Sequence, residues 1–246
     1  MRILVVLPTY DEAANIEEVL HRLHAAVPDA HVLIVDDASP DGTADLAEKI
    51  GAELSGEGGR RYVEVLRRPS KSGLGSAYRE GFRHGLINGF DVMVEMDSDL
   101  SHDPAVLPTL LQAVDDGADL SIGSRYIPGG SIPDWSWHRR ALSRWGNRYA
   151  GFVLGNDIAD STSGFRAYRS SILALVDFHA MRAEGYGFQI EMAYRVMTSG
   201  GNIQEVPIAF VDRIRGTSKM SGWIVIEALV LVTWWGVRDR LLKVRR

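Results

Sequence analysis

Runs of apolar residues alternate with helix-like patterns along the first half of the chain. Continuous stretches rich in Val, Ile and Leu, typical of strands covered on both faces, predict strands at 3–7, 31–35, 62–66, 91–96 and 120–123. Apolar residues at helical spacing predict helices near 16–23, 43–50 and 76–86. Strands that alternate with helices in this way imply right-handed βαβ units. We therefore expect an α/β fold with a mixed, mainly parallel sheet flanked by helices.

The pattern changes after the fifth predicted strand. Residues 126–140 carry several Pro and Gly residues and two Trp residues, which predicts a long irregular segment of the kind that often serves a function. Beyond it we expect helices at 142–154 and 188–197 and short strands near 203–210.

The stretch 223–237 is apolar except for Glu227 and Thr233, and basic residues follow it. A bilayer-spanning helix needs roughly 20 apolar residues, so this pattern favours an amphipathic helix lying on a membrane surface. The alternative is a helix that packs on the core and ends in a solvated basic tail. We therefore divide the chain into an α/β domain, 1–222, and a C-terminal amphipathic, basic helical segment, 223–246.

Composition excludes several classes of protein. The chain has 27 Lys and Arg against 32 Asp and Glu, a net charge of −5, so nothing in its overall charge points to nucleic acid. It has no Cys, which excludes disulfides, thiolate zinc sites and a cysteine nucleophile. The first apolar run is short and leads into Asp11 and Glu12, unlike a signal peptide. We expect a cytoplasmic location.

Acidic residues follow three of the predicted strands, as Asp11-Glu12, Asp36-Asp37 and Asp97-Ser98-Asp99. Ligands of parallel sheets bind beyond the carboxyl ends of the strands. Because side chains i and i+2 share a face, Asp97 and Asp99 can converge on one Mg²⁺ or Mn²⁺ ion, which binds oxygen ligands and substrate phosphates. The alternative for such a triplet is a turn or a helix cap.

Basic residues supply candidate anion ligands. Arg125 follows the fifth predicted strand and either faces the same crevice or forms a salt bridge to one of the aspartates. Arg213 and Lys219 lie in a cationic, Gly-containing segment that can fold over an anion, or else is a solvated charge run. Arg139, Arg140 and Arg144, with Ser143, either bind a phosphate or solvate a helix face.

Several segments together resemble one known family. They are LPTYDEAANI at 7–16, VDDASPDGT at 35–43, KSGLGSAY at 71–78, MDSDLSH at 96–102, SRY at 124–126, SGFRAYR at 163–169, GYGFQIEM at 185–192 and the stretch 205–219. In order and spacing these segments resemble family 2 glycosyltransferases, which have the Rossmann-like GT-A fold. Within that family they are similar to dolichol-phosphate mannose synthases and their bacterial polyprenol-phosphate counterparts, from about residue 3 to 222.

The resemblance implies roles for individual residues. The implied donor contacts are Pro8, Tyr10, Glu12, Val35, Asp37, Asp97, Ser98, Asp99, Arg213 and Lys219, and the implied metal ligands are Asp97, Asp99 and Ser101. Some relatives carry Gln in place of Ser101. The implied ligands of the acceptor phosphate are Arg125, Arg139 and Ser143, with Arg140 as a competing candidate. Polymerising relatives carry a Gln/Arg-x-x-Arg-Trp motif, but Ala141 precedes Arg144-Trp145 here, which disfavours a processive synthase.

The reaction implied by this resemblance is transfer of mannose from GDP-mannose to a polyprenyl monophosphate, with inversion, to give polyprenyl-phosphate mannose and GDP. Mg²⁺ or Mn²⁺ is the expected cofactor, and Asp97, Asp99 and Arg125 are the expected catalytic residues. A phosphate monoester is already an anion at pH 7, because its second pKa is about 6, so no general base is assigned.

We expect a peripheral protein on the cytoplasmic face of the cell membrane, with an integral-membrane partner as a further possibility. The alternatives are a polyprenyl-phosphate glucosyl- or aminosugar transferase, or a catalytically silent subunit that binds a sugar nucleotide.

Overall fold

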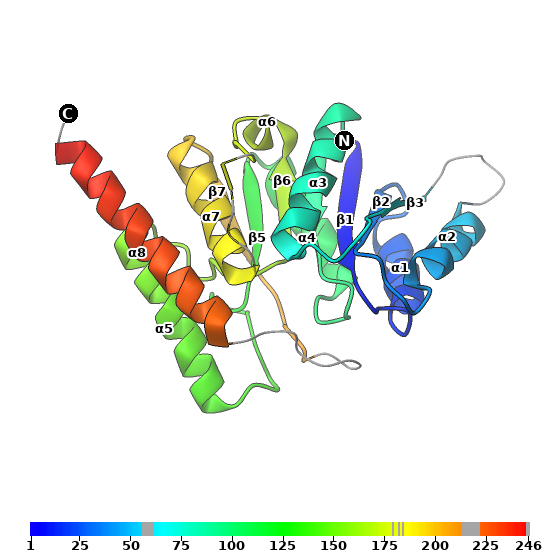
Figure 1. The fold of residues 1–246 in the computed structure, drawn as a ribbon, viewed down its shortest axis with the longest axis horizontal. Coiled ribbons are helices and arrows are strands. Elements are labelled where there is room, and N and C mark those ends of the chain that lie inside the picture. The colour runs from blue at the N-terminus through cyan, green and yellow to red at the C-terminus, as the bar shows by residue number, and fades with distance from the viewer. Residues whose placement is uncertain (56–61, 179, 182, 184, 213–221, 245–246) are drawn as a thin grey trace.

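A single sheet of seven strands, in the order β3-β2-β1-β4-β6-β5-β7, forms the centre of the molecule (Figure 1). The computed structural model describes residues 1–55, 62–178, 180–181, 183, 185–212 and 222–244. The strands are β1 (Ile3–Thr9), β2 (His31–Asp36), β3 (Val63–Arg67), β4 (Val92–Glu95), β5 (Leu120–Ser124), β6 (Arg166–Arg169) and β7 (Ile203–Pro207). All neighbouring pairs are parallel except those of β6, which is antiparallel to β4 and β5. The predicted mixed, mainly parallel sheet is confirmed.

Helices cover both faces of this sheet. They are α1 (Ile16–Ala26), α2 (Thr43–Leu54), α3 (Leu74–Ile87), the 3₁₀ helix η1 (Pro104–Val106), α4 (Leu107–Asp115), α5 (Trp137–Leu154), α6 (Ser170–Leu173), α7 (Gly185–Thr198) and α8 (Gly222–Val244). Val5 and Leu7 pack with α1, α2 and α4, whereas Leu4 and Val6 pack with α3, α6 and α7. Burial on both faces explains why the strands read as continuous apolar runs.

Strand β6 was not predicted from the sequence. Its residues, Arg166 to Arg169, lack an apolar run, yet Arg166 is completely buried. The Arg166 guanidinium donates hydrogen bonds to the backbone carbonyls of Ser161, Ser163 and Gln189, at 2.7, 2.7 and 2.8 Å. These bonds satisfy the buried charge, so an arginine can occupy the middle of the sheet.

Helix α8 packs on α5 and α7 through Ala228, Val232 and Trp235, and Figure 1 shows α5 and α8 side by side at the end of the molecule farthest from β3. Its opposite side exposes further apolar residues, among them Val230 and Trp234. Over 226–238, where its side chains are described, the helix therefore has apolar residues on both sides. The amphipathic character of the whole segment 223–246 stays a prediction. No helix in the described part of the chain has the length and apolarity that crossing a bilayer requires.

Candidate active site

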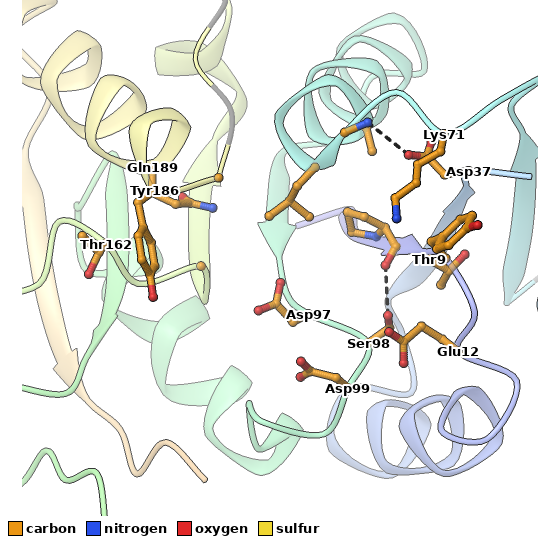
Figure 2. Close-up of a pocket in the computed structure, with 17 residues that line it drawn as sticks. Thr9, Glu12, Asp37, Lys71, Asp97, Ser98, Asp99, Thr162, Tyr186 and Gln189 are labelled. Atoms are coloured by element: carbon orange, nitrogen blue, oxygen red, sulfur yellow. Dashed lines mark hydrogen bonds between the residues drawn. The ribbon is translucent and has the colours of Figure 1, made fainter. Parts of the chain in front are cut away.

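A cavity of about 410 Å³ lies beyond the carboxyl ends of β1 and β4 (Figure 2). Seven of the residues predicted to contact the donor line it: Pro8, Tyr10, Glu12, Asp37, Asp97, Ser98 and Asp99. The structure thus brings together residues separated by up to about ninety positions, because parallel strands present their carboxyl ends at one edge of the sheet.

The loops that form this edge contain unusual backbone. The backbone is left-handed at Asp11 after β1, Ala38 after β2 and Leu100 after β4, with φ of 57°, 58° and 65°. Residues other than Gly, Asn and Asp rarely adopt this conformation. Non-glycine residues in this region cluster at functional sites. In the described chain, all three belong to the loops around the cavity.

Hydrogen bonds hold the Asp37 side chain at the wall of the cavity. Its carboxylate accepts hydrogen bonds from Arg68 Nη1 at 2.6 Å and from the backbone N–H groups of Ser72 and Gly73 at 3.0 and 3.2 Å. The preceding Asp36 points elsewhere and accepts from the Thr9 hydroxyl at 2.9 Å. Only the second member of this acidic pair lines the cavity.

Lys71 is the single cation among the described residues that line this cavity, beside the carboxylates of Glu12, Asp37, Asp97 and Asp99. Its Nζ lies 3.8 Å from the centre of the Tyr10 ring. The described lining is therefore strongly acidic, and a nucleoside diphosphate would need further positive charge to bind there.

Hydrogen bonds with β1 and α3 hold the Asp97-Ser98-Asp99 triplet. Ser98 Oγ donates to the Pro8 carbonyl at 2.9 Å, and Tyr78 Oη donates to Asp97 Oδ1 at 3.4 Å. Burial, as the largest cause, together with the charge of Asp97, raises the pKa of Tyr78 well above its usual value. The tyrosine therefore stays a neutral donor to Asp97.

Ser101 occupies a different place from the predicted metal ligand. Its side chain is buried, does not line the cavity, and donates to Asp99 Oδ1 at 2.5 Å. Ser101 therefore orients Asp99. The described residues contain no group of three His, Cys, Asp or Glu that could hold a metal, so Asp97 and Asp99 fit Mg²⁺ or Mn²⁺ only if water and substrate phosphates complete the coordination shell.

A second cavity, of about 320 Å³, shares Thr162 and Tyr186 with the first. Two of the residues predicted to bind the acceptor phosphate, Arg139 and Ser143 of α5, line it, and the competing Arg140 does not. Much of the remaining lining is apolar and comes from α5, α7 and α8. Arg139 lies against the Trp135 ring at 3.8 Å and pairs with Asp212 at 3.2 Å. This second cavity has a basic group beside an apolar wall.

Arg125 lines neither cavity, contrary to the prediction of a phosphate contact. Its buried guanidinium forms two hydrogen bonds of 2.7 Å to Asp160 and one of 2.8 Å to the Thr162 hydroxyl. Burial alone would lower the pKa of Arg125, but the Asp160 carboxylate raises it above the ordinary value. The alternative of a salt bridge is correct, although the partner is Asp160 and not a strand-end carboxylate.

Val35, also predicted to contact the donor, does not line the first cavity. Its side chain is fully buried in the core, and its backbone pairs with both β1 and β3. Arg213 and Lys219 lie outside the described residues.

The structure adds residues that the sequence did not single out. The first cavity, of about 410 Å³, is also lined by Lys71, Thr162, Gly164, Tyr186 and Gln189. Gln189 carried a signal, because it is a polar residue on the buried side of α7, where an apolar residue is expected. Thr162 and Gly164 lie in an irregular segment whose position depends on the Arg125–Asp160 pair, so no periodicity marks them.

The sequence is similar to known glycosyltransferases. Residues 4–176 match the family described as glycosyl transferase family 2. The chain is 48% identical over 244 residues to the polyprenol monophosphomannose synthase of Mycolicibacterium smegmatis, covering 99% of this chain and 90% of that protein. It is 50% identical over 240 residues to the undecaprenyl-phosphate mannosyltransferase of Micrococcus luteus, covering 98% and 96%.

A solved structure shares the fold at lower identity. Glucosyl-3-phosphoglycerate synthase from Mycobacterium tuberculosis, crystallised with Mn²⁺, UDP-glucose and phosphoglyceric acid, superposes with a TM-score of 0.72 at 19% identity, covering 96% of this chain and 79% of that one. The family match spans more than half of the sequence, and the curated relatives align over nearly all of it. The chain therefore belongs to glycosyl transferase family 2.

Proposed function

We propose that this glycosyltransferase transfers mannose from GDP-mannose to a polyprenyl monophosphate, with inversion at the anomeric carbon. The observation that carries the proposal is the pair of neighbouring cavities that share Thr162 and Tyr186, one lined by carboxylates at strand ends and the other by a basic group and apolar side chains. An inverting transfer needs the leaving group and the nucleophile on opposite sides of the sugar, and two cavities that meet at Thr162 and Tyr186 suit that geometry. The names of the two relatives at 48% and 50% identity support mannose and a prenyl phosphate.

The donor would lie in the cavity of about 410 Å³, with its nucleoside toward Asp37 and its diphosphate toward Asp97 and Asp99. A divalent cation held by these two aspartates would neutralise the charge that develops on the departing diphosphate. Ser101 and Tyr78 would keep the two carboxylates in place through their hydrogen bonds. Lys71 would supply positive charge to the same cavity.

The acceptor would lie in the cavity of about 320 Å³. Its phosphate would bind Arg139 and Ser143, and the first part of its tail would contact the apolar residues of α5, α7 and α8. A phosphate monoester attacks as an anion, so the protein has to position it and exclude water, but does not have to remove a proton.

Exposed apolar residues on α5 and α8 support a position on the membrane surface. Trp137, Trp145 and Phe152 of α5 are 75%, 52% and 78% exposed, and Trp234 of α8 is 61% exposed. Exposed arginines, among them Arg148, lie on the same helix α5. Aromatic residues next to cationic ones suit an interface with anionic lipid headgroups. We place this surface on the cytoplasmic face of the cell membrane, where nucleotide sugar and lipid acceptor meet, with an integral-membrane partner as possible extra anchorage.

A transfer assay with purified protein tests the reaction. Radiolabelled GDP-mannose, a polyprenyl phosphate in detergent micelles and either Mg²⁺ or Mn²⁺ should give a mannolipid that is extracted into organic solvent. The Asp99→Asn variant, which keeps the shape of the side chain and removes its charge, should form product about 10²–10³-fold more slowly. UDP-glucose and an aminosugar nucleotide serve as competing donors. Product from one of these and not from GDP-mannose, or GDP binding without any product, would contradict the proposal.

A further inference from the structure

The transferred hexose has to lie where the two cavities meet, since it links the donor diphosphate before the reaction and the acceptor phosphate after it. Thr162 and Tyr186 line both cavities at this junction, and Gly164 and Gln189 line the donor cavity with them. In Figure 2 the Gln189 side chain on α7 and the Asp97 carboxylate at the end of β4 reach toward the same gap.

Gln189 places a buried amide at this junction. The residue is only 3% exposed, and its Oε1 has no hydrogen-bond partner within the described part of the protein. This oxygen is closed off from solvent, and the amide nitrogen Nε2 is the atom that lies near Gly164. The hydroxyl of Thr162, by contrast, is already engaged by Arg125, Asn147 and Asp160.

The surroundings of Gln189 hold it in place. Its backbone carbonyl accepts a hydrogen bond of 2.8 Å from Arg166, and its side chain supports the buried carboxyl group of Glu95. Tyr168 Oη also donates to Glu95, at 3.4 Å. These contacts fix the residue from the side of the core, and Nε2 is the amide atom that lies next to the gap beside Gly164.

Gly164 keeps the gap open. A Cβ atom at this position would lie 3.4 Å from Gln189 Nε2 and 3.8 Å from Asp97 Oδ1, so it would fill the space between the amide and the carboxylate. The space opposite Gln189 therefore depends on the absence of a side chain at Gly164.

We propose that the Gln189 amide binds a hydroxyl group of the donor hexose in the gap beside Gly164, and thereby helps the enzyme to select its sugar. The proposal rests on the proposed function, since it assigns the gap to the sugar of the donor. A site built to hydrogen-bond a hydroxyl discriminates strongly against ligands that present it wrongly, because a buried polar group is then left unpaired.

The test compares a ligand that contains the sugar with one that lacks it. In Gln189→Met, which keeps the length of the side chain and removes the amide, we expect kcat/KM for GDP-mannose to fall about 100-fold. The preference for GDP-mannose over GDP-glucose should narrow in the same variant. The Kd for GDP, measured calorimetrically with Mg²⁺, should stay within about twofold of the wild-type value. Equal losses for GDP and GDP-mannose, or no loss for either, would overturn the proposal.

A second variant guards against a folding defect. Gly164→Ala should fold, because φ at this residue is not in the left-handed region, and it should lower turnover of the nucleotide sugar while GDP binding persists. Unchanged turnover in this variant would contradict the gap as the sugar site. If the wild type uses another nucleotide sugar, the proposed function fails, and the same comparison between that sugar nucleotide and its bare nucleotide still tests Gln189.

Discussion

The cavity proposed for the donor and the cavity proposed for the acceptor, called here the donor side and the acceptor side, are built in different ways. On the donor side, buried strands end in carboxylates that backbone N–H groups and hydroxyls hold at fixed positions, as for Asp37 and Asp99. On the acceptor side, the three helices α5, α7 and α8 enclose an apolar cavity, and α5 and α8 leave aromatic residues exposed. The donor side is thus suited to a small polar ligand of fixed shape, and the acceptor side to a long apolar one.

This difference predicts that variants on one side leave the other side intact. We expect donor-side changes to lower the rate of transfer without altering membrane binding. Acceptor-side changes should weaken binding of the lipid acceptor or of the membrane without altering donor binding. Residues at the boundary should affect both.

The largest effect is expected at Asp97. Asp97→Asn removes one of the two charges that would hold the cation, and transfer should fall about 10³-fold, the scale typical of lost electrostatic stabilisation in a transition state. Initial rates of mannolipid formation measure this. Binding of the variant to anionic vesicles should match that of the wild type, and a parallel loss of vesicle binding would show that the two sides are not independent.

Arg125 tests the boundary, because its partner Asp160 and its contact Thr162 connect β5 to the junction of the cavities. Arg125→Met leaves a buried carboxylate unpaired, which should lower the free energy of unfolding by about 3–5 kcal/mol. Urea unfolding measures it. The matched control is Arg148→Met on α5, an exposed position, where a change within about 0.5 kcal/mol is expected. Similar values for both variants would contradict the structural role of the ion pair.

Arg139 sharpens the comparison from the acceptor side. Arg139→Ala should raise KM for the polyprenyl phosphate about tenfold, the cost of one charge-assisted hydrogen bond at a partly exposed site, and leave KM for GDP-mannose unchanged. Arg148→Ala, on the same helix but outside both cavities, is the control. A rise in the KM for GDP-mannose would contradict the assignment of Arg139 to the acceptor phosphate.

Trp145 and Trp234 test the membrane surface. Replacing both by Ser should reduce partitioning to vesicles that contain anionic lipid by roughly tenfold, because each substitution removes apolar area that the wild-type protein would bury in the membrane interface. Flotation assays measure the bound fraction. Ile87, which is 83% exposed at the end of α3, provides the control for losing an exposed apolar residue elsewhere. Equal partitioning of Ile87→Ser and the double variant would remove this surface from consideration.

The smallest effect is expected at Ala38, which is exposed and has φ of 58°. Ala38→Gly relieves left-handed backbone strain but adds freedom to the unfolded chain, so stability should rise by less than about 1 kcal/mol. Ala14→Gly, at an exposed position without positive φ, should instead destabilise by about 0.5–1 kcal/mol. The same sign in both variants would argue against strain in the loop after β2.

The same difference between the two sides explains what could be predicted from the sequence. Donor residues such as Glu12, Asp37 and Asp97 follow apolar strands directly, so the order of strands alone brings them to one edge. The family match confirms the enzyme class that their motifs indicated.

Two features could not be read in this way. The strand β6 is marked by no apolar run, because hydrogen bonds and not apolar contacts satisfy Arg166. The pairing of Arg125 with Asp160 joins residues 35 positions apart across an irregular segment. Periodicity carries no information about such a contact, and so Arg125 was assigned to a phosphate.

The size of the second cavity has a consequence for the choice of lipid. With about 320 Å³, it would hold the phosphate of the proposed acceptor and only the beginning of a polyprenyl tail, so the rest of the tail would remain outside the protein. On the proposed function, the enzyme would recognise the head of its acceptor and ignore the length of the tail. One such protein could then serve a cell whose carrier lipids differ in chain length.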